Sequence, residues 1–164
     1  MKNSAKKTVD LLIGRNIKIA TAESCTGGLI AKLITDVSGA SSVFECGVVS
    51  YANSVKTSLL NVSEDTLKKY GAVSEQTVCE MVTGVQKLSD ADIAVAVSGI
   101  AGPTSDSTEK PVGLIWIAVW YNGTITTKKL ENKFTHDIRE NNRNSAAKEA
   151  FELVCKVLEA QKAV

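Results

Sequence analysis

The feature that most constrains the fold is an almost uninterrupted apolar run from Ala91 to Val97. A strand that is covered on both faces is apolar at successive positions, whereas a strand with one wet face alternates with polar residues. The run therefore predicts a central strand with other elements packed on both sides. It is far shorter than the 18 or more apolar residues of a membrane span, and no other stretch of the chain reaches that length. We expect no membrane contact.

The segments around this strand alternate between helical and extended patterns. Apolar residues at helical spacing predict helices, and β-branched or apolar runs predict strands. An Asn122-Gly123 pair between two extended segments is a strong hairpin signal. The predicted helices are 4–13 (with Gly14 as C-cap), 29–34, 53–60, 63–70 (with Ser63 as N-cap), 74–88 (capped within 74–77, which begins with Ser74) and 137–160, and the predicted strands are 17–22, 43–51, 91–97, 112–120 and 124–130.

This alternation predicts one α/β domain over residues 1–164, a length typical of one domain. The expected architecture has three layers, α/β/α, around a mixed, mostly parallel sheet, and it ends in a hairpin and a long helix. In sheets of this kind, ligands bind at the strand ends and in the loops that follow them.

Charge and cysteine usage narrow the function classes. The chain has 19 Lys and Arg against 18 Asp and Glu, so a nucleic-acid partner is not expected. One histidine, His136, and scattered cysteines do not suggest a metal site, and no cofactor is predicted. None of the cysteines forms a C-x-x-C pair, which favours reduced thiols in a cytoplasmic protein. They are Cys25, Cys46, Cys79 and Cys155.

The first candidate site follows the strand at 17–22 and precedes a helix. Ser24 or Thr26 is either a nucleophile there or simply a helix cap. Gly27 and Gly28 allow close approach of the backbone to a ligand, and the start of the helix offers N–H donors. The segment matches neither of the two common nucleotide-binding glycine motifs.

Further candidates lie at later turns. Tyr51 ends a strand, and Lys56 lies in the first turns of the next helix, where it is either a solvated side chain or, if buried, a base of lowered pKa. Ser98 and Gly99 end the central strand, and they belong either to a ligand site or to a self-contained turn.

Two arginines on the last helix form another candidate pair. Arg139 and Arg143 are four residues apart, so they share one helix face. They are either a phosphate clamp or a solvated face. A lysine can replace histidine as the base of a nucleophilic serine, which makes Lys56 a candidate partner for Ser24.

At these residues the sequence resembles the CinA C-terminal domain family of bacterial proteins. The run AESCTGG at 22–28 is similar to the family signature, and four later blocks follow in the family's order. They are residues 47–56, 70–74, 98–103 and 109–113. The resemblance covers the chain from about residue 20 to the last helix. Many members carry a further N-terminal domain, and the length of this chain indicates the stand-alone form.

The resemblance implies an amidohydrolase that converts nicotinamide mononucleotide to nicotinate mononucleotide and ammonia, without a metal. Ser24 would be the nucleophile, Lys56 the base and Tyr51 a member of the proton relay. Backbone N–H groups near Gly27 and Gly28 would form the oxyanion hole. The substrate-binding residues would be Thr26, Gly27, Gly28, Ser98, Gly99, Arg139 and Arg143.

Two departures and one alternative belong to this interpretation. The family usually has Thr where Ser98 stands, which keeps the hydroxyl. It usually has a glycine run after Pro103, where this chain has TSDS at 104–107, and this weighs against a phosphate cradle in that loop. The alternative is a non-catalytic module, linked to competence or DNA damage, that binds a nucleotide or a partner protein. We also expect a homo-oligomer, a dimer or larger.

Overall fold

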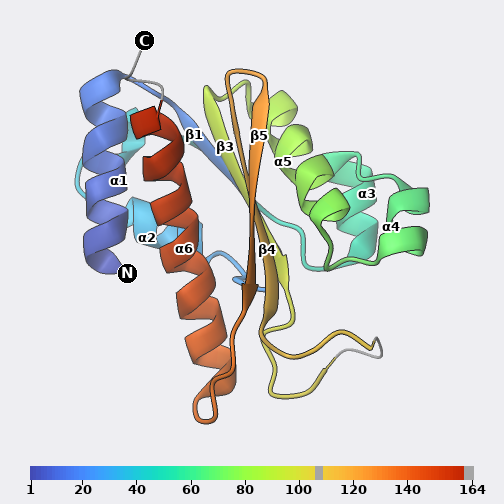
Figure 1. Cartoon of the computed structure of the whole chain (residues 1–164). Coiled ribbons are helices and arrows are strands. Elements are labelled where there is room, and N and C mark those ends of the chain that lie inside the picture. The colour runs from blue at the N-terminus through green and yellow to red at the C-terminus, as the bar shows by residue number, and fades with distance from the viewer. Residues whose placement is uncertain (106–108, 161–164) are drawn as a thin grey trace.

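A computed structural model describes residues 1–105 and 109–160, which form one α/β domain (Figure 1). The order of elements agrees with the alternation that the sequence predicts. The helices are α1 (Lys2–Arg15), α2 (Leu29–Thr35), α3 (Asn53–Leu60), α4 (Glu64–Tyr70), α5 (Glu75–Ser89) and α6 (Ile138–Ala160). The strands are β1 (Ile19–Glu23), β2 (Phe44–Val49), β3 (Ile93–Gly99), β4 (Leu114–Tyr121) and β5 (Thr124–Glu131), and a short 3₁₀ helix, η1, spans Ala40–Ser42.

The five strands form one mixed sheet in the order β2-β1-β3-β4-β5. Strand β1 pairs in parallel with β2 and β3, whereas β4 is antiparallel to both β3 and β5. Four of the five strands therefore point the same way, which confirms a mixed, mostly parallel sheet. Asn122 and Gly123 both have positive φ, 48° and 77°, as the predicted tight hairpin turn requires.

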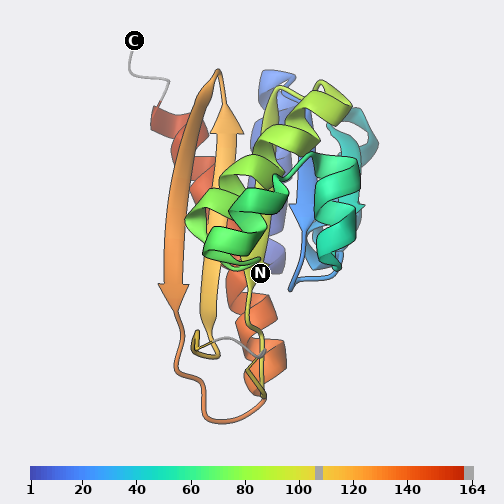
Figure 2. The ribbon, with the colours of Figure 1, turned by 90° about the vertical axis from the view of Figure 1, so that its right-hand side faces the viewer.

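Helices cover both faces of the sheet and make three layers. Helices α1, α2 and α6 lie on one face, and α3, α4 and α5 lie on the other (Figures 1 and 2). The central strand β3 is buried along nearly its whole length, as its apolar run predicts.

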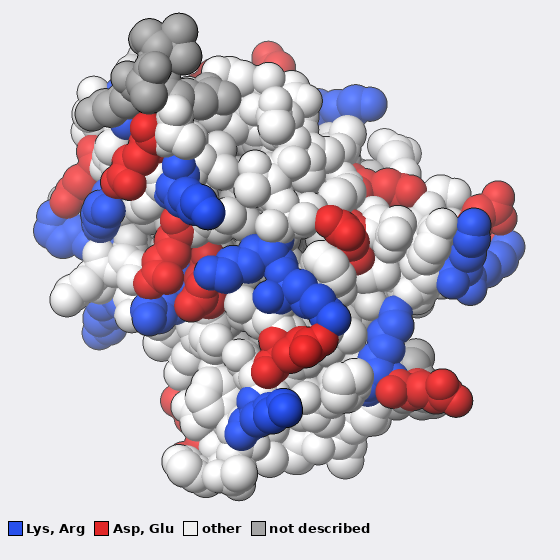
Figure 3. Space-filling model, in the orientation of Figure 1, with Lys and Arg blue, Asp and Glu red and all other residues white. Residues whose placement is uncertain are grey.

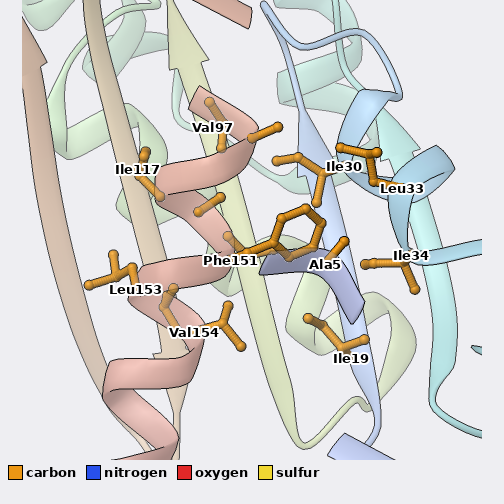
Figure 4. Packing of buried hydrophobic residues seen from close by; sticks show 14 of the residues in the cluster. Ala5, Ile19, Ile30, Leu33, Ile34, Val97, Ile117, Phe151, Leu153 and Val154 are labelled. Atoms are coloured by element: carbon orange, nitrogen blue, oxygen red, sulfur yellow. The ribbon is translucent and has the colours of Figure 1, made fainter. Parts of the chain in front are cut away.

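The two faces of the sheet carry side chains of different size. Ile93, Val95 and Val97 belong to the same buried cluster as Phe151 of α6. Figure 4 shows Val97 and Phe151 within this cluster. The opposite face presents alanines to α5, namely Ala20, Ala22, Ala94, Ala96 and Ala118. Small side chains let a helix axis approach the sheet closely, so α5 lies tight against it.

The helix ends agree with the predicted caps except at α1 and α2, where Gly28 is the N-cap, without a side-chain hydrogen bond, and neither Ser24 nor Thr26 caps the helix. Ser63 and Ser74 each accept a backbone N–H, from Asp65 and Thr77, as predicted N-caps. Gly14 is not the C-cap of the first helix, because the helix continues to Arg15 and Asn16 closes it with a φ of 52°. Asparagine tolerates this left-handed conformation. Within the described residues no helix is long and apolar enough to cross a membrane.

Two helical glycines give a matched test of this packing. A Cβ on Gly84 of α5 would lie 2.0 Å from the carbonyl oxygen of Leu60 in α3, whereas a Cβ on Gly14 would meet nothing within 4 Å. We expect Gly84→Ala to lower the free energy of unfolding by about 1–3 kcal/mol. Gly14→Ala should raise it by about 0.5–1 kcal/mol, because alanine loses less backbone entropy in a helix. Urea denaturation of both variants checks this, and equal effects would contradict the close contact.

Candidate active site

A cavity of about 340 Å³ opens where the parallel strands β1 and β3 end. This is the edge at which α/β sheets hold ligands. Its lining comes from the β1–α2 turn, the start of α3, the turn before α5, the loop after β3 and the start of α6. The residues are Ser24, Cys25, Tyr51, Asn53, Lys56, Ala72, Val73, Ser98–Gly102, Thr104, Ser105 and Arg139.

Ser24 and Lys56 meet in this cavity. Ser24 directly follows β1, and Lys56 projects from the first turns of α3, so that the Lys56 Nζ donates to Ser24 Oγ over 3.1 Å. The same ammonium donates to the carbonyl oxygens of Ser50, at 2.7 Å, and Tyr51, at 3.4 Å. No carboxylate of the described residues forms an ion pair with it.

The burial of Lys56 alters its acid–base chemistry. Only 1% of the residue is exposed, and burial disfavours the charged ammonium, so the pKa of Lys56 falls from 10.5 to about 8. At pH 7 about one side chain in ten is then neutral and able to accept a proton. A neutral amine in hydrogen-bond contact with a serine hydroxyl can act as the general base for that hydroxyl.

Glu23, the last residue of β1, is a feature that the sequence reasoning missed. Its side chain is fully buried and accepts the backbone N–H groups of Gly28, Ile30 and Ala31 over 2.8–3.0 Å. The start of α2 is therefore already occupied by an internal carboxylate. The available signal was an acidic residue at the end of the predicted strand 17–22, just before the turn that leads to the predicted helix 29–34, because anionic groups favour the start of a helix.

In this arrangement the N–H groups of Gly27 and Gly28, which were predicted to lie near the oxyanion, already have internal acceptors. The N–H of Gly28 donates to Glu23, and the N–H of Gly27 donates to the Ser24 carbonyl oxygen. Neither glycine lines the cavity. In the part of the chain that the structure describes, no oxygen accepts from the backbone N–H of Cys25 or Thr26, which directly follow Ser24.

Cys25 lies next to Ser24 but is a poor nucleophile. Burial raises the pKa of its thiol to about 12, so the thiol stays protonated. The neighbouring Thr26 does not line the cavity, and its buried hydroxyl oxygen has no hydrogen-bond partner in the described residues. Its carbonyl oxygen instead accepts from Arg143 Nη2 over 2.8 Å.

The two arginines of α6 have different surroundings. Arg139 lines the cavity and donates to the Gly102 carbonyl oxygen over 2.9 Å and to the Tyr51 hydroxyl over 2.8 Å. Arg143, one turn further along, ties α6 to the β1–α2 turn through Thr26 and does not line the cavity. Arg139 thus lines the same cavity as Ser24 and Lys56, whereas Arg143 lies outside that cavity.

Tyr51 contacts Arg139 and Lys56 through different atoms. The prediction makes it a member of the proton relay; its carbonyl oxygen accepts from Lys56 Nζ, whereas its hydroxyl accepts from Arg139. The residue is 60% exposed at the cavity mouth. Strand β2 ends at Val49 rather than at Tyr51, so that the chain turns there toward α3.

Ser98 and Gly99 line the cavity, but both also have structural partners. Ser98 is 1% exposed, and its hydroxyl donates to the Ala72 carbonyl oxygen over 2.7 Å. A Cβ on Gly99 would lie 2.6 Å from Ile115 Cγ1, so the close pairing of β3 with β4 requires glycine. Asn53, which the sequence reasoning missed, begins α3 and also lines the cavity. In the segment 104–107, Asp106 and Ser107 lie outside the described residues.

His136 is not part of the cavity. It is exposed and shares a hydrogen bond with the Thr135 hydroxyl over 3.2 Å. Among the residues that the structure describes, no group of three or more His, Cys, Asp or Glu could hold a metal ion.

The fold and the cavity define a three-layer α/β domain in which a buried lysine contacts a half-buried serine. The family model of the CinA C-terminal domain matches residues 1–158, and the chain belongs to this family. Its relatives include a "CinA-like protein" of Thermotoga maritima, 47% identical over 95% of the chain. A "putative competence-damage inducible protein" of Acetivibrio thermocellus is 48% identical over 88% of it.

Solved structures agree with the fold. The competence/damage inducible protein CihA of Agrobacterium tumefaciens superposes with a TM-score of 0.90 at 37% identity, covering 96% of this chain and 94% of that one. A CinA superfamily protein of Klebsiella pneumoniae gives 0.91 at 34% identity, covering 97% and 98%. The chain spans 37% and 34% of the lengths of the Thermotoga and Acetivibrio relatives. The predicted homo-oligomer stays a prediction.

The lowered pKa of Lys56 predicts a pH-dependent stability. The unfolded chain binds the proton up to about pH 10.5, whereas the folded chain releases it near pH 8, so burial of the ammonium costs most below pH 8. The contribution of Lys56 to the free energy of unfolding therefore rises between pH 8 and pH 10.5. The stability advantage of Lys56→Met over wild type should shrink by about 2 kcal/mol from pH 7 to pH 10 in urea denaturation. A pH-independent difference would contradict the shift.

Proposed function

We propose that this chain is a serine–lysine amidohydrolase that hydrolyses the carboxamide of nicotinamide mononucleotide. The observation that carries the proposal is the contact between Ser24 Oγ and a buried Lys56 Nζ of lowered pKa. The substrate comes from the family resemblance, and the cavity supports it with a second cation, Arg139, besides the proposed reacting pair. Family membership alone does not specify an amide substrate.

Acylation begins with neutral Lys56. Its Nζ takes the hydroxyl proton while Ser24 Oγ bonds to the amide carbon, and the carbonyl oxygen becomes an oxyanion. The N–H groups of Cys25 and Thr26 are the candidate donors for that oxyanion, because Glu23 and Ser24 occupy those of Gly28 and Gly27. As the C–N bond breaks, Lys56 returns the proton to the nitrogen, and ammonia leaves.

Deacylation repeats these roles with water. Lys56 takes a proton from a water molecule as its oxygen attacks the ester carbon of the acyl-enzyme. The bond to Ser24 Oγ then breaks, and Lys56 gives the proton back to that oxygen. The products are the carboxylic acid, which ionises, and ammonia, so atoms and charges balance over one amide and one water.

The polar groups suggest one direction of substrate binding. The carboxamide would lie at Ser24, and the phosphate would lie at Arg139, whose guanidinium can bind phosphate through two parallel hydrogen bonds. Tyr51 would then serve as a positioning residue for Arg139 through its hydroxyl. Arg143 would act indirectly, by holding the β1–α2 turn at Thr26.

The nucleophile and the base can be tested together. Ser24→Ala and Lys56→Arg should each abolish release of ammonia from nicotinamide mononucleotide while circular dichroism stays unchanged. Arginine keeps the charge but does not lose its proton in this pH range. Cys25→Ala is the matched control and should keep substantial activity, because the Cys25 thiol is protonated. Full activity of Ser24→Ala would refute the mechanism.

A separate prediction concerns the phosphate. Arg139→Ala should lower kcat/KM for nicotinamide mononucleotide by about tenfold or more, which corresponds to about 1.4 kcal/mol. It should affect the phosphate-free riboside much less, since remote binding energy is lost only for the mononucleotide. Arg143→Ala is the control, because loss of its contact with Thr26 should lower both activities alike. Equal losses in Arg139→Ala would assign the phosphate to another group.

The alternative is a binding module without catalysis. The buried lysine favours the enzyme, because a binding site gains little from an ammonium that it must desolvate. On the face drawn in Figure 3, basic and acidic side chains are interspersed, which gives no support there to a nucleic-acid partner. Nucleotide binding without ammonia release from any pyridine carboxamide would favour the module.

A further inference from the structure

Glu23 is a buried acid that the proposed mechanism does not use. Its carboxylate accepts three backbone N–H groups at the start of α2, and none of the described lysines or arginines forms an ion pair with it. Hydrogen bonds to an ionised acceptor are among the stronger ones in proteins. The first turn of α2 is therefore tied firmly to the end of β1.

The hydrogen bonds of the Glu23 carboxylate fix the end of a turn that contains two flexible glycines. Residues 24–28 connect β1 to α2, and Gly27 and Gly28 have positive φ values of 58° and 94°. Glycine adopts many conformations, so this turn alone would not hold Ser24 in one place. The Glu23 side chain joins the far end of the turn, at Gly28, to the residue that precedes the nucleophile.

The backbone of Glu23 also leads to the base. Its carbonyl oxygen accepts the N–H of Ser50 over 2.8 Å, and the Ser50 carbonyl oxygen in turn accepts from Lys56 Nζ over 2.7 Å. Ser24 itself donates its N–H to Val97 of β3 over 3.0 Å. One residue thus connects the strand end that carries the nucleophile with the turn that orients the base.

We propose that Glu23 is a positioning residue that holds the Ser24 turn against Lys56. The inference rests on the proposed serine–lysine chemistry but not on the identity of the amide. The carboxylate accepts from Gly28, Ile30 and Ala31 and not from Cys25 or Thr26, whose N–H groups are the proposed oxyanion donors. Its effect is on the geometry of reaction, and the Arg139 end of the cavity does not depend on it.

Glu23→Gln is the sharpest change. It keeps the shape but replaces one acceptor oxygen with an NH₂ group that faces N–H donors. A misplacement of about 1 Å can cost about 100-fold in rate, so kcat should fall tenfold or more. The KM for the mononucleotide should stay within about threefold, since binding at Arg139 is untouched. Glu23→Asp, which keeps the charge but shortens the reach, should also lower kcat.

The control is Glu80→Gln. The Glu80 carboxylate likewise accepts a backbone N–H near a helix start, from Ser63 over 2.7 Å, but it lies outside the cavity. The kcat of Glu80→Gln should equal that of wild type.

Each variant is also treated with a fluorophosphonate, which reacts with activated serines, and the labelled residue is found by mass spectrometry. This readout needs no knowledge of the natural substrate.

The labelling rate per folded molecule separates the hypotheses. In wild type it should rise with pH toward 8 and require Lys56, and in Glu23→Gln it should fall as far as kcat. Lys56-dependent labelling of Ser24 without ammonia release would refute the amide substrate alone. Absence of such labelling would refute both proposals. The positioning role would be overturned if Glu23→Gln and Glu23→Asp label at the wild-type rate, or if neither variant folds. Either result would show that Glu23 serves only stability.

Discussion

Burial of the Lys56 ammonium is the interaction on which the site depends. The ammonium has lost its water, and its described partners are a serine hydroxyl and two backbone carbonyl oxygens. An acidic neighbour would satisfy the charge better, but it would also hold the proton on the lysine. Burial of Lys56 therefore lowers the free energy of unfolding near pH 7, but it leaves part of the amine neutral at that pH, as the proposed base must be.

The fold holds this unfavourable group in place through a close helix contact. Lys56 lies on α3, whose last residue, Leu60, presses its carbonyl oxygen against Gly84 of α5. Helix α5 in turn lies close to the alanine face of the sheet. The depth of Lys56 is thus set by small residues at two successive interfaces, because a larger side chain at either one would push α3 outward.

The sequence predicts most of the fold and a part of the site. The apolar run of β3, the Asn122-Gly123 turn and the serine caps are local signals, and all of them are confirmed. Gly14 was wrongly predicted to cap the first helix. Arg15 continues the helix, and Asn16 ends it in the left-handed conformation. The spacing of Arg139 and Arg143 correctly places both on one helix face. Arg139 lines the cavity, whereas Arg143, one helical turn or about 5.4 Å further along, holds the β1–α2 turn instead. Such a difference depends on how α6 is docked, which the spacing does not reveal. The internal acceptors of the Gly27 and Gly28 N–H groups, which are the Ser24 carbonyl oxygen and the Glu23 carboxylate, are likewise evident only in three dimensions.

Among the residues that the structure describes, no carboxylate forms an ion pair with Lys56, the proposed base. An anion within about 4–6 Å of Lys56 would raise its pKa and leave less of the neutral amine. The nearby Glu23 carboxylate is satisfied by three backbone N–H groups and makes no ion pair with the lysine. Arg139 lies at the exposed start of α6, where water screens a bound phosphate. The proposed substrate, which carries its phosphate at the end remote from its amide, suits this division, because Arg139 can hold the phosphate without bringing an anion close enough to raise the pKa of Lys56.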